Sequence, residues 1–140
     1  MSERDVLLDT APLVALFNAR DQWHARTATL WPDLVGRCVT TEAIVAEASH
    51  LVLRATGNAF APLEFLLAAG IPIEPLNSAG HRRAVRLMQQ YQDLPMDYGD
   101  ATLVVLAEAL GIGDVFTTDR RGFTAYRAPR AARFRIFPNA

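Results

Sequence analysis

The segment from Asp93 to Asp119 constrains the fold more than any other part of this chain. It predicts a helix over residues 101–110 that is apolar on nearly every face, then a Gly-Ile-Gly break, then a short strand, DVFTT, over residues 114–118. A helix that is apolar all round is buried inside a domain rather than lying on its surface. We therefore expect the chain to fold around this helix and the strand that follows it.

Short apolar runs alternate with helical patterns along the whole chain. Such an alternation is typical of an α/β domain with a mainly parallel sheet. We therefore predict one domain over residues 1–140, with a sheet of about five short strands. The predicted strands cover residues 6–8, 37–40, 71–76, 114–118 and 133–137, and the predicted helices cover residues 10–17, 21–31, 41–54, 61–69, 78–91 and 101–110.

Composition excludes several classes of protein. A length of 140 residues, 51% of them hydrophobic, suits one globular domain. The apolar runs are too short to span a membrane, and the N-terminus lacks the basic-then-apolar layout of a signal peptide. The single cysteine, Cys38, cannot form an internal disulfide, so we expect a cytoplasmic protein in which Cys38 is a small buried hydrophobic residue. The absence of lysine excludes a P-loop nucleotide site.

Acidic residues stand where strands end and where a helix begins. Asp9 directly follows the first predicted strand, and Asp119 directly follows the fourth. Ligands of an open parallel sheet bind beyond the carboxyl ends of its strands, so these two side chains converge if the two strands are neighbours. Asp97 and Asp100 are three residues apart and share one face of a helix start. Glu47 lies at the edge of the apolar face of its predicted helix and can point toward the same place.

Four or five carboxylates in one place repel one another, and their pKa values rise unless a cation lies between them. Mg²⁺ or Mn²⁺ suits such a site, because both ions prefer carboxylate, water and phosphate oxygens. A metal of this kind can activate water for hydrolysis of a phosphodiester. The hydroxyls of Thr10, Thr117 and Thr118 could hold the carboxylates from behind, or serve only strand formation and helix capping. Asp97 is equally suited to being only a helix cap.

Charge is distributed unevenly along the chain. All 15 acids lie at or before Asp119, whereas residues 120–140 contain arginines and no acid. An arginine-rich tail on an acidic body suggests a polyanion or an acidic partner near the C-terminus. An ordinary solvated surface explains the charges of this tail equally well.

Four motifs, in their order and spacing, resemble those of the PIN domain, and most of all those of the VapC-type toxins of bacterial toxin–antitoxin pairs. The motifs are LLDTAPLVALF, IVAEASHLV, DLPMDYGDATLVVLAEALGI and VFTTDRRGF, and the resemblance extends from Leu7 to Phe137. It implies a Rossmann-like three-layer α/β/α fold and an Mg²⁺-dependent endoribonuclease that acts as a toxin, with tRNA and rRNA as candidate substrates. It also implies a homodimer and a cognate antitoxin.

The resemblance assigns roles to individual residues. Those that match are Asp9, Glu47, Asp100 and Asp119 for the acidic quartet of the family, Asp97 for a frequent extra acid, and Thr10 and Thr117 for its hydroxyl positions. The five acids are thus the candidate ligands of Mg²⁺ or Mn²⁺. Arg120 and Arg121, just past the last acid, could contact RNA phosphates or an antitoxin carboxylate.

Other α/β proteins fit the sequence less well. A receiver domain needs a lysine, and a haloacid-dehalogenase-like phosphatase would have Asp-x-Asp after its first strand, where this chain has Asp9-Thr-Ala11. Two alternatives stay open: a PIN-like nuclease that is not a toxin, and a non-catalytic binding module whose acids cap helices. Metal-dependent stabilisation separates the nuclease from the binding module, since only a carboxylate site gains stability from a divalent ion.

Overall fold

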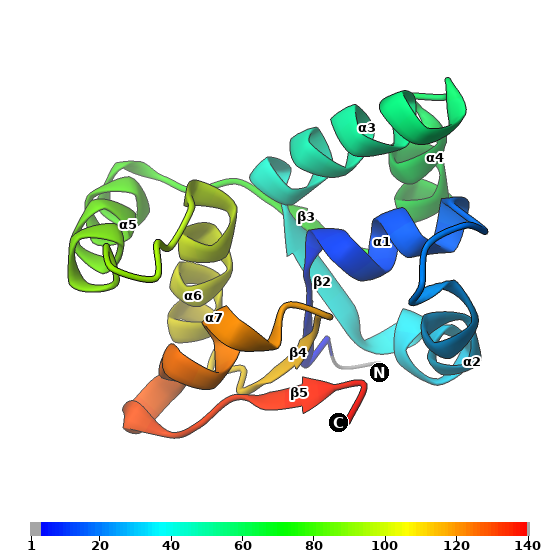
Figure 1. Cartoon of the computed structure of the whole chain (residues 1–140). Coiled ribbons are helices and arrows are strands. Elements are labelled where there is room, and N and C mark those ends of the chain that lie inside the picture. Colours follow the sequence, from blue (N-terminus) through cyan, green and yellow to red (C-terminus); the bar gives the residue numbers. More distant parts are fainter. Residues whose placement is uncertain (1–3, 140) are drawn as a thin grey trace.

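The chain folds around a parallel sheet whose five strands lie in the order β3-β2-β1-β4-β5 (Figure 1). The computed structural model describes residues 4–139. Each pair of neighbouring strands is parallel, which confirms the predicted α/β class. The strands are β1 (Val6–Leu8), β2 (Cys38–Thr41), β3 (Ile73–Glu74), β4 (Asp114–Phe116) and β5 (Arg135–Phe137).

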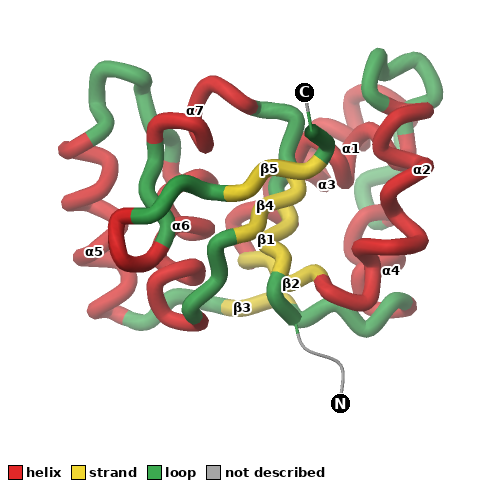
Figure 2. Tube along the Cα trace, turned by 90° about the horizontal axis from the view of Figure 1, so that it is seen from below, coloured by secondary structure: helices red, strands yellow, loops and turns green. Residues whose placement is uncertain are grey.

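Helices cover both faces of the sheet and complete the three predicted layers (Figure 2). Helices α1 to α4 lie on one side of the sheet, and α5 to α7 lie on the other. They are α1 (Thr10–Phe17), α2 (His24–Leu34), α3 (Glu42–Thr56), α4 (Ala61–Ala68), α5 (Ser78–Gln90), α6 (Tyr98–Leu110) and α7 (Arg120–Ala125), with 3₁₀ turns at Val35–Arg37 and Pro129–Ala131. In the part of the chain that the structure describes, no helix has the length and apolar character needed to cross a membrane.

The core consists of two apolar clusters, one on each face of the sheet. Leu7 and Val115 share a cluster with residues of α5, α6 and α7, whereas Val6, Leu8 and Phe116 belong to the opposite cluster. Successive side chains of a strand point to opposite faces, so even three-residue strands contribute to both clusters. Helix α6 contacts both β2 and α5 and is buried along most of its length, as its uniform apolar character predicts.

The single cysteine belongs to this core. Cys38 is fully buried at the start of β2, as predicted. Burial raises the pKa of its thiol to about 12, so the side chain stays protonated at physiological pH. Cys38 is therefore a packing residue with little nucleophilic character.

Two segments between β4 and β5 differ from the prediction. Strand β4 ends at Phe116 instead of Thr118. The N–H of Thr117 still donates to the Phe137 carbonyl (2.9 Å), and the chain then turns into α7. Helix α7 was not predicted, because six residues that include a glycine are too short to show a helical period.

The second helix also differs from the prediction, which placed it over residues 21–31. Helix α2 spans His24–Leu34 and continues past Pro32. A proline inside a helix removes one backbone hydrogen bond, and Pro32 lies in the last turn, where few such bonds remain to lose. Burial of Trp31 and Leu34 on either side of it holds that turn against the core.

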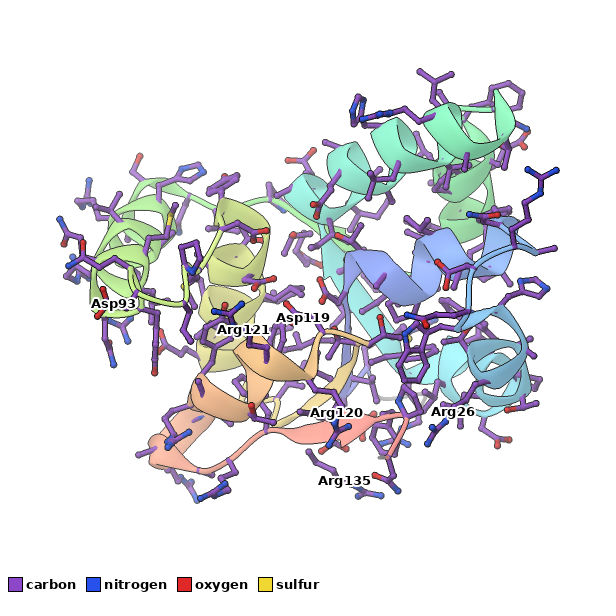
Figure 3. The ribbon with its side chains drawn as sticks, viewed as in Figure 1. Arg26, Asp93, Asp119, Arg120, Arg121 and Arg135 are labelled. Atoms are coloured by element: carbon purple, nitrogen blue, oxygen red, sulfur yellow. The ribbon has the colours of Figure 1, made fainter. Side chains whose placement is uncertain are left out.

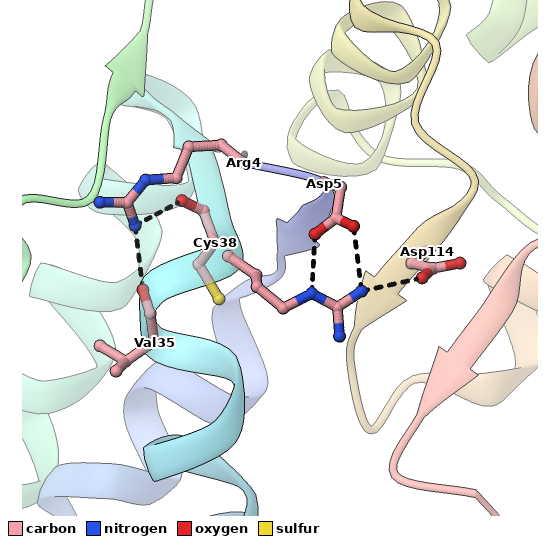
Figure 4. Close-up of polar contacts among 6 residues, drawn as sticks. Arg4, Asp5, Val35, Cys38 and Asp114 are labelled. Atoms are coloured by element: carbon pink, nitrogen blue, oxygen red, sulfur yellow. Dashed lines mark hydrogen bonds and ion pairs between the residues drawn. The ribbon is translucent and has the colours of Figure 1, made fainter. Parts of the chain in front are cut away.

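The amino ends of the strands are joined by two arginines (Figure 4). Arg37 donates two hydrogen bonds to the Asp5 carboxylate (2.8 and 3.1 Å) and one to Asp114 (3.4 Å). The hydrogen bond from Arg37 lowers the pKa of Asp5. Arg4 donates to the Val35 carbonyl (3.0 Å). These contacts tie the segments beside β1, β2 and β4 together at one edge and leave the carboxyl ends free for a site.

Candidate active site

The carboxyl ends of β1 and β4 lie side by side. Leu8 at the end of β1 pairs with Phe116 at the end of β4. From β1 the strand order runs outward to β2 and β3, whereas β4 and β5 extend the other way, so the crevice between β1 and β4 is the switch point of the sheet. Asp9 follows β1 directly, and Asp119 follows β4 after two threonines. The structure therefore places these two acids at the edge where ligands of this architecture bind.

Asp9 is almost completely buried, with 5% of its surface exposed. It occupies the position before α1, where one carboxylate oxygen accepts the N–H of Thr10 (2.8 Å). Its other oxygen accepts the hydroxyl of Thr117 (2.6 Å). Both oxygens are thus held in place, one by a helix start and one by the segment after β4.

Asp100 lies in the first turn of α6 and is 8% exposed. The phenol of Tyr126 donates a hydrogen bond to Asp100 Oδ2 (2.8 Å). Gly122 makes room for this phenol, since a Cβ at that position would lie 2.8 Å from the Tyr126 hydroxyl and 2.9 Å from its ring. Sequence reasoning missed both residues, because Tyr126 is 26 residues from Asp100 and only the packing of α7 brings it there.

The other three acids are exposed and reach the site from three different helices. Glu47 of α3 accepts the hydroxyl of Thr10 (2.7 Å). Asp97 caps α6 through the N–H of Asp100 (2.8 Å), as the cap hypothesis proposed. Asp119 occupies the position before α7 and accepts the N–H of Gly122 (3.4 Å). Asp9, Asp97 and Asp119 therefore each stand at a helix N-terminus, where the helix dipole favours negative charge.

All five predicted acids line one cavity of about 200 Å³. A second hollow of about 200 Å³ shares Asp97, Asp100 and Asp119 with it. The residues around the first are Asp9, Thr10, Ala11, Val14, Asp21, Glu47, Leu51, Asp97, Asp100 and Asp119. The second hollow also includes Arg121 and Tyr126. Carboxylates brought together from four helices and two strand ends thus face the same space.

Three residues near the cavity lie differently from what the sequence predicts. In the described part of the chain, the Thr118 hydroxyl makes no hydrogen bond to these acids. Arg120 donates to the Pro138 carbonyl (3.0 Å) and points away from Asp119, whereas Arg121 lies beside the cavity (Figure 3). Asp21, which the prediction placed at the start of the second helix, lies in the turn before α2 and lines the cavity. The turn after α1 was predicted from the break between two helices, but the direction in which it carries Asp21 does not follow from the sequence.

Burial and mutual repulsion make two of these acids unusually basic. Burial, followed by the charges of Asp9 and Asp97, raises the pKa of Asp100 to about 8, against the lowering effect of the Tyr126 hydrogen bond. Burial also raises the pKa of Asp9 to about 6, although the hydrogen bonds from Thr117 and Thr10 lower it. The charge of Asp119 raises both values further. A positive charge placed between these two buried acids would favour their ionised forms, so the site favours binding of a cation.

The donor set fits a hard divalent cation. Within residues 4–139, no three carboxylate, imidazole or thiol groups lie close enough to form a complete ligand set as they stand. The buried pair Asp9 and Asp100 is fixed, whereas Glu47, Asp97 and Asp119 are exposed side chains that can rotate toward it. Oxygen-only donors with room for water and phosphate match Mg²⁺ or Mn²⁺ rather than zinc.

Comparison with known proteins agrees with this arrangement. A family model described as the PIN domain matches residues 6–129. The chain is 30% identical over 135 residues to Ribonuclease VapC26 of Mycobacterium tuberculosis, a match that covers 95% of this chain and 100% of that protein. Its fold is similar to the crystal structure of VapC20 of Mycobacterium tuberculosis, described as a sarcin-ricin loop cleaving toxin. The TM-score is 0.73 and the identity 21%, over 79% of this chain and 86% of that chain.

Proposed function

Since the chain belongs to the PIN domain family and is a ribonuclease of the VapC type, we propose that it hydrolyses RNA phosphodiester bonds at the carboxylate cavity with Mg²⁺ or Mn²⁺. One observation carries the proposal. Asp9 and Asp100 are buried, their pKa values are raised, and three further acids face the same cavity. Such an arrangement is costly for a protein that only needs helix caps, and a divalent cation offsets the cost.

The residues of the cavity have two roles: some would bind the cation, and others orient the residues that bind it. Asp9 and Asp100 would hold the cation together with the exposed acids Glu47, Asp97 and Asp119. Thr117, Thr10 and Tyr126 fix the oxygens of the buried pair, so these two carboxylates would need little rearrangement, whereas the three exposed acids would have to turn toward the ion. When bound there, a divalent cation would polarise the phosphate as a Lewis acid and would lower the pKa of a water. Arg121 lines the neighbouring hollow, which shares Asp97, Asp100 and Asp119 with the cavity, and its guanidinium can bind a phosphate of the RNA.

We extend the proposal to the biological role, in which this ribonuclease is a growth-inhibiting toxin neutralised by a cognate antitoxin and works as a homodimer. The printed descriptions of its relatives support the ribonuclease and toxin roles. Exposed apolar side chains on and between α3 and α4, namely Leu53, Phe60, Leu63 and Leu67, provide surface for a protein partner.

The proposed activity predicts a strict dependence on divalent metal. Purified protein should cleave labelled tRNA or rRNA fragments with Mg²⁺ or Mn²⁺, lose this activity in EDTA, and regain it when either ion is added in excess. Gel electrophoresis of the labelled fragments measures the products. Undiminished cleavage in EDTA, or an intact RNA under all these conditions, would contradict the proposal and favour a binding module.

Tyr126→Phe should weaken cleavage without unfolding the protein. The variant keeps the ring that packs against Phe123 and Tyr91, at centroid distances of 5.1 Å, and removes only the hydroxyl that holds Asp100. Loss of a group that orients a metal ligand costs roughly 10- to 100-fold in metal affinity or activity. We expect a loss in that range, both in the rate of cleavage and in Mn²⁺ affinity measured by calorimetry.

Tyr91→Phe is the matched control for this substitution. Its ring contacts Tyr126, but within residues 4–139 its hydroxyl has no hydrogen-bond partner in the protein. We expect it to cleave RNA and bind Mn²⁺ as the wild type does. Equal losses in the two variants would show that Tyr126 acts through packing alone.

A further inference from the structure

The arginine-rich tail singled out in the sequence forms a surface apart from the carboxylate cavity. A hollow of about 470 Å³ lies between α5, the end of α6 and the turn after α7, and its lining includes Arg83, Arg127 and Arg130. A second hollow, of about 430 Å³, shares Arg130 and adds Arg133. The turn lies on the same side of the sheet as α5 and α6 (Figure 2). We call the two hollows together the arginine groove.

The arginine groove carries an uncompensated positive charge. Glu108 is the single acid in the lining of the groove, and Arg83 donates two hydrogen bonds of 2.9 Å to its carboxylate. In the described part of the chain, Arg127, Arg130 and Arg133 have no carboxylate within ion-pair distance. Three exposed guanidinium groups therefore have no carboxylate to neutralise them, although Arg127 donates to backbone carbonyls, on a chain whose net charge is −1.

The turn that presents these arginines is held in a specific conformation. Arg130 and Ala131 have φ values of 64° and 61°, in the left-handed region that non-glycine residues seldom adopt. The N–H of Ala128 donates to the Ala132 carbonyl (2.8 Å), and Arg127 forms a β-bridge with Arg133. Strained backbone persists only where its surroundings fix it, so Arg130 and Arg133 occupy defined positions.

The arginine groove adjoins the carboxylate cavity across two tyrosines. Tyr126 borders the hollow that contains Asp100 and Arg121, and the next residue, Arg127, lines the arginine groove. Tyr91 also lines the groove and packs against Tyr126 with ring centroids 5.1 Å apart. Tyr126 itself is buried, so the two hollows lie on either side of its ring, and a polyanion bound at the cavity can reach the arginines over the surface between them.

We propose that the arginine groove binds the phosphate backbone of the RNA strand beside the cleavage site. This inference rests on the proposed ribonuclease function. Guanidinium groups bind phosphates in a bidentate manner, and a row of arginines without acids matches a chain of phosphates. An acidic protein is the competing ligand, and the test below separates it from RNA. Five of the eight exposed large apolar side chains of the described residues lie on or between α3 and α4, on the other side of the sheet, whereas Val85, Tyr98 and Leu110 lie on α5 and α6.

The double variant Arg130→Gln/Arg133→Gln tests the groove. Both side chains are exposed, whereas Arg127 is left unchanged because it donates to the Ala125 carbonyl (2.8 Å) at the end of α7. Binding of an unstructured, mixed-sequence, fluorescein-labelled RNA is measured by anisotropy in EDTA across a range of NaCl concentrations. Each phosphate contact on a single strand adds about 0.7 to the slope of log K against log salt. We expect the slope to fall by about 1.4, so that the variant binds roughly 25-fold more weakly than the wild type at 0.1 M NaCl if the two proteins bind equally at 1 M.

The matched control is Arg20→Gln/Arg54→Gln, which removes the same charge from two exposed arginines near α1 and α3. We expect the control to retain the wild-type slope. Equal slopes in the two double variants would contradict the proposal. Binding of labelled polyglutamate, a model acidic polypeptide, is measured in the same way, and an Arg130→Gln/Arg133→Gln variant that loses it while keeping RNA binding would also contradict the proposal. Cleavage of the same RNA by the wild type with Mg²⁺ is recorded in parallel. If the wild type fails to cleave it, the proposed function fails, whereas cleavage together with an unchanged slope rejects the groove alone.

Discussion

Replacing Asp100 with asparagine is expected to abolish RNA cleavage and, at the same time, to stabilise the metal-free protein at pH 8. Asparagine has nearly the same shape, and its amide oxygen can still accept the hydrogen bond from Tyr126. What disappears is the charge that would hold the cation. Loss of one preorganised electrostatic group in an active site costs about 10²–10³-fold, and loss of a direct metal ligand should cost on the order of 10³-fold or more.

The expected stabilisation by Asp100→Asn follows from the burial of Asp100. Asp100 is 8% exposed, and its pKa is raised to about 8. Each tenfold change in acidity between the folded and unfolded states corresponds to about 1.4 kcal/mol. The stabilisation from Asp100→Asn should therefore be near zero at pH 4 and reach several kcal/mol, as an upper limit, by pH 8. Urea unfolding in EDTA at the two pH values measures it.

Asp93→Asn is the control for this substitution. Asp93 is exposed and lies after α5, away from Asp119 (Figure 3). We expect this variant to keep wild-type cleavage and wild-type stability at both pH values. Full cleavage by Asp100→Asn, or destabilisation by it at pH 8, would show that Asp100 has neither the role nor the environment described above.

The metal-free protein should lose stability as the pH rises from about 4 to about 8. Asp9 and Asp100 have pKa values of about 6 and about 8 in the folded protein, against 3.8 ordinarily. The folded state therefore keeps protons that the unfolded state has already released. Stability from such groups is fully present below pH 4 and is lost as the pH rises through the folded-state values. The loss should amount to several kcal/mol at most, because the two groups are coupled.

A pH series of urea unfolding curves in EDTA measures this loss. The contribution of Asp5 to stability changes with pH in the opposite direction, because the hydrogen bond from Arg37 lowers the pKa of Asp5. That contribution is lost only below pH 4, outside the range measured here. Saturating Mn²⁺ should reverse the trend, since the ion displaces the protons and binds more tightly as the pH rises. A stability that stays constant or increases between pH 4 and 8 in EDTA would contradict the raised pKa values of Asp9 and Asp100.

Sequence patterns were sufficient to place those site residues whose position depends only on their own strand or helix. Asp9 and Asp119 could be placed because each follows an apolar run, and the convergence of parallel strand ends does not depend on side-chain detail. Helix α6 could be predicted because its apolar character is continuous from Ala101 to Ala107. Asp97 could be identified as a cap from its position before that helix.

The features that sequence reasoning missed all depend on contacts between distant segments. Arg120 and Arg121 are adjacent, so their side chains point in directions about 100° apart on a helix and only one of them can face the cavity. Which one does so depends on α7, which is too short to predict. Tyr126 and Gly122 act as a pair across one turn of α7, and their link to Asp100 appears only once that helix packs against α6.

Binding of Mn²⁺ to the wild type and to Asp9→Asn/Asp100→Asn is the most direct test of the carboxylate cavity. Melting temperatures are recorded at pH 8 over a range of Mn²⁺ concentrations, without RNA. A ligand that binds only the folded state stabilises it by about 2.7 kcal/mol at a hundred times its Kd, so the wild-type melting temperature should rise steadily with concentration. The account predicts this rise in the wild type and its absence in the double variant; an equal rise in both proteins, or none in the wild type, would contradict it.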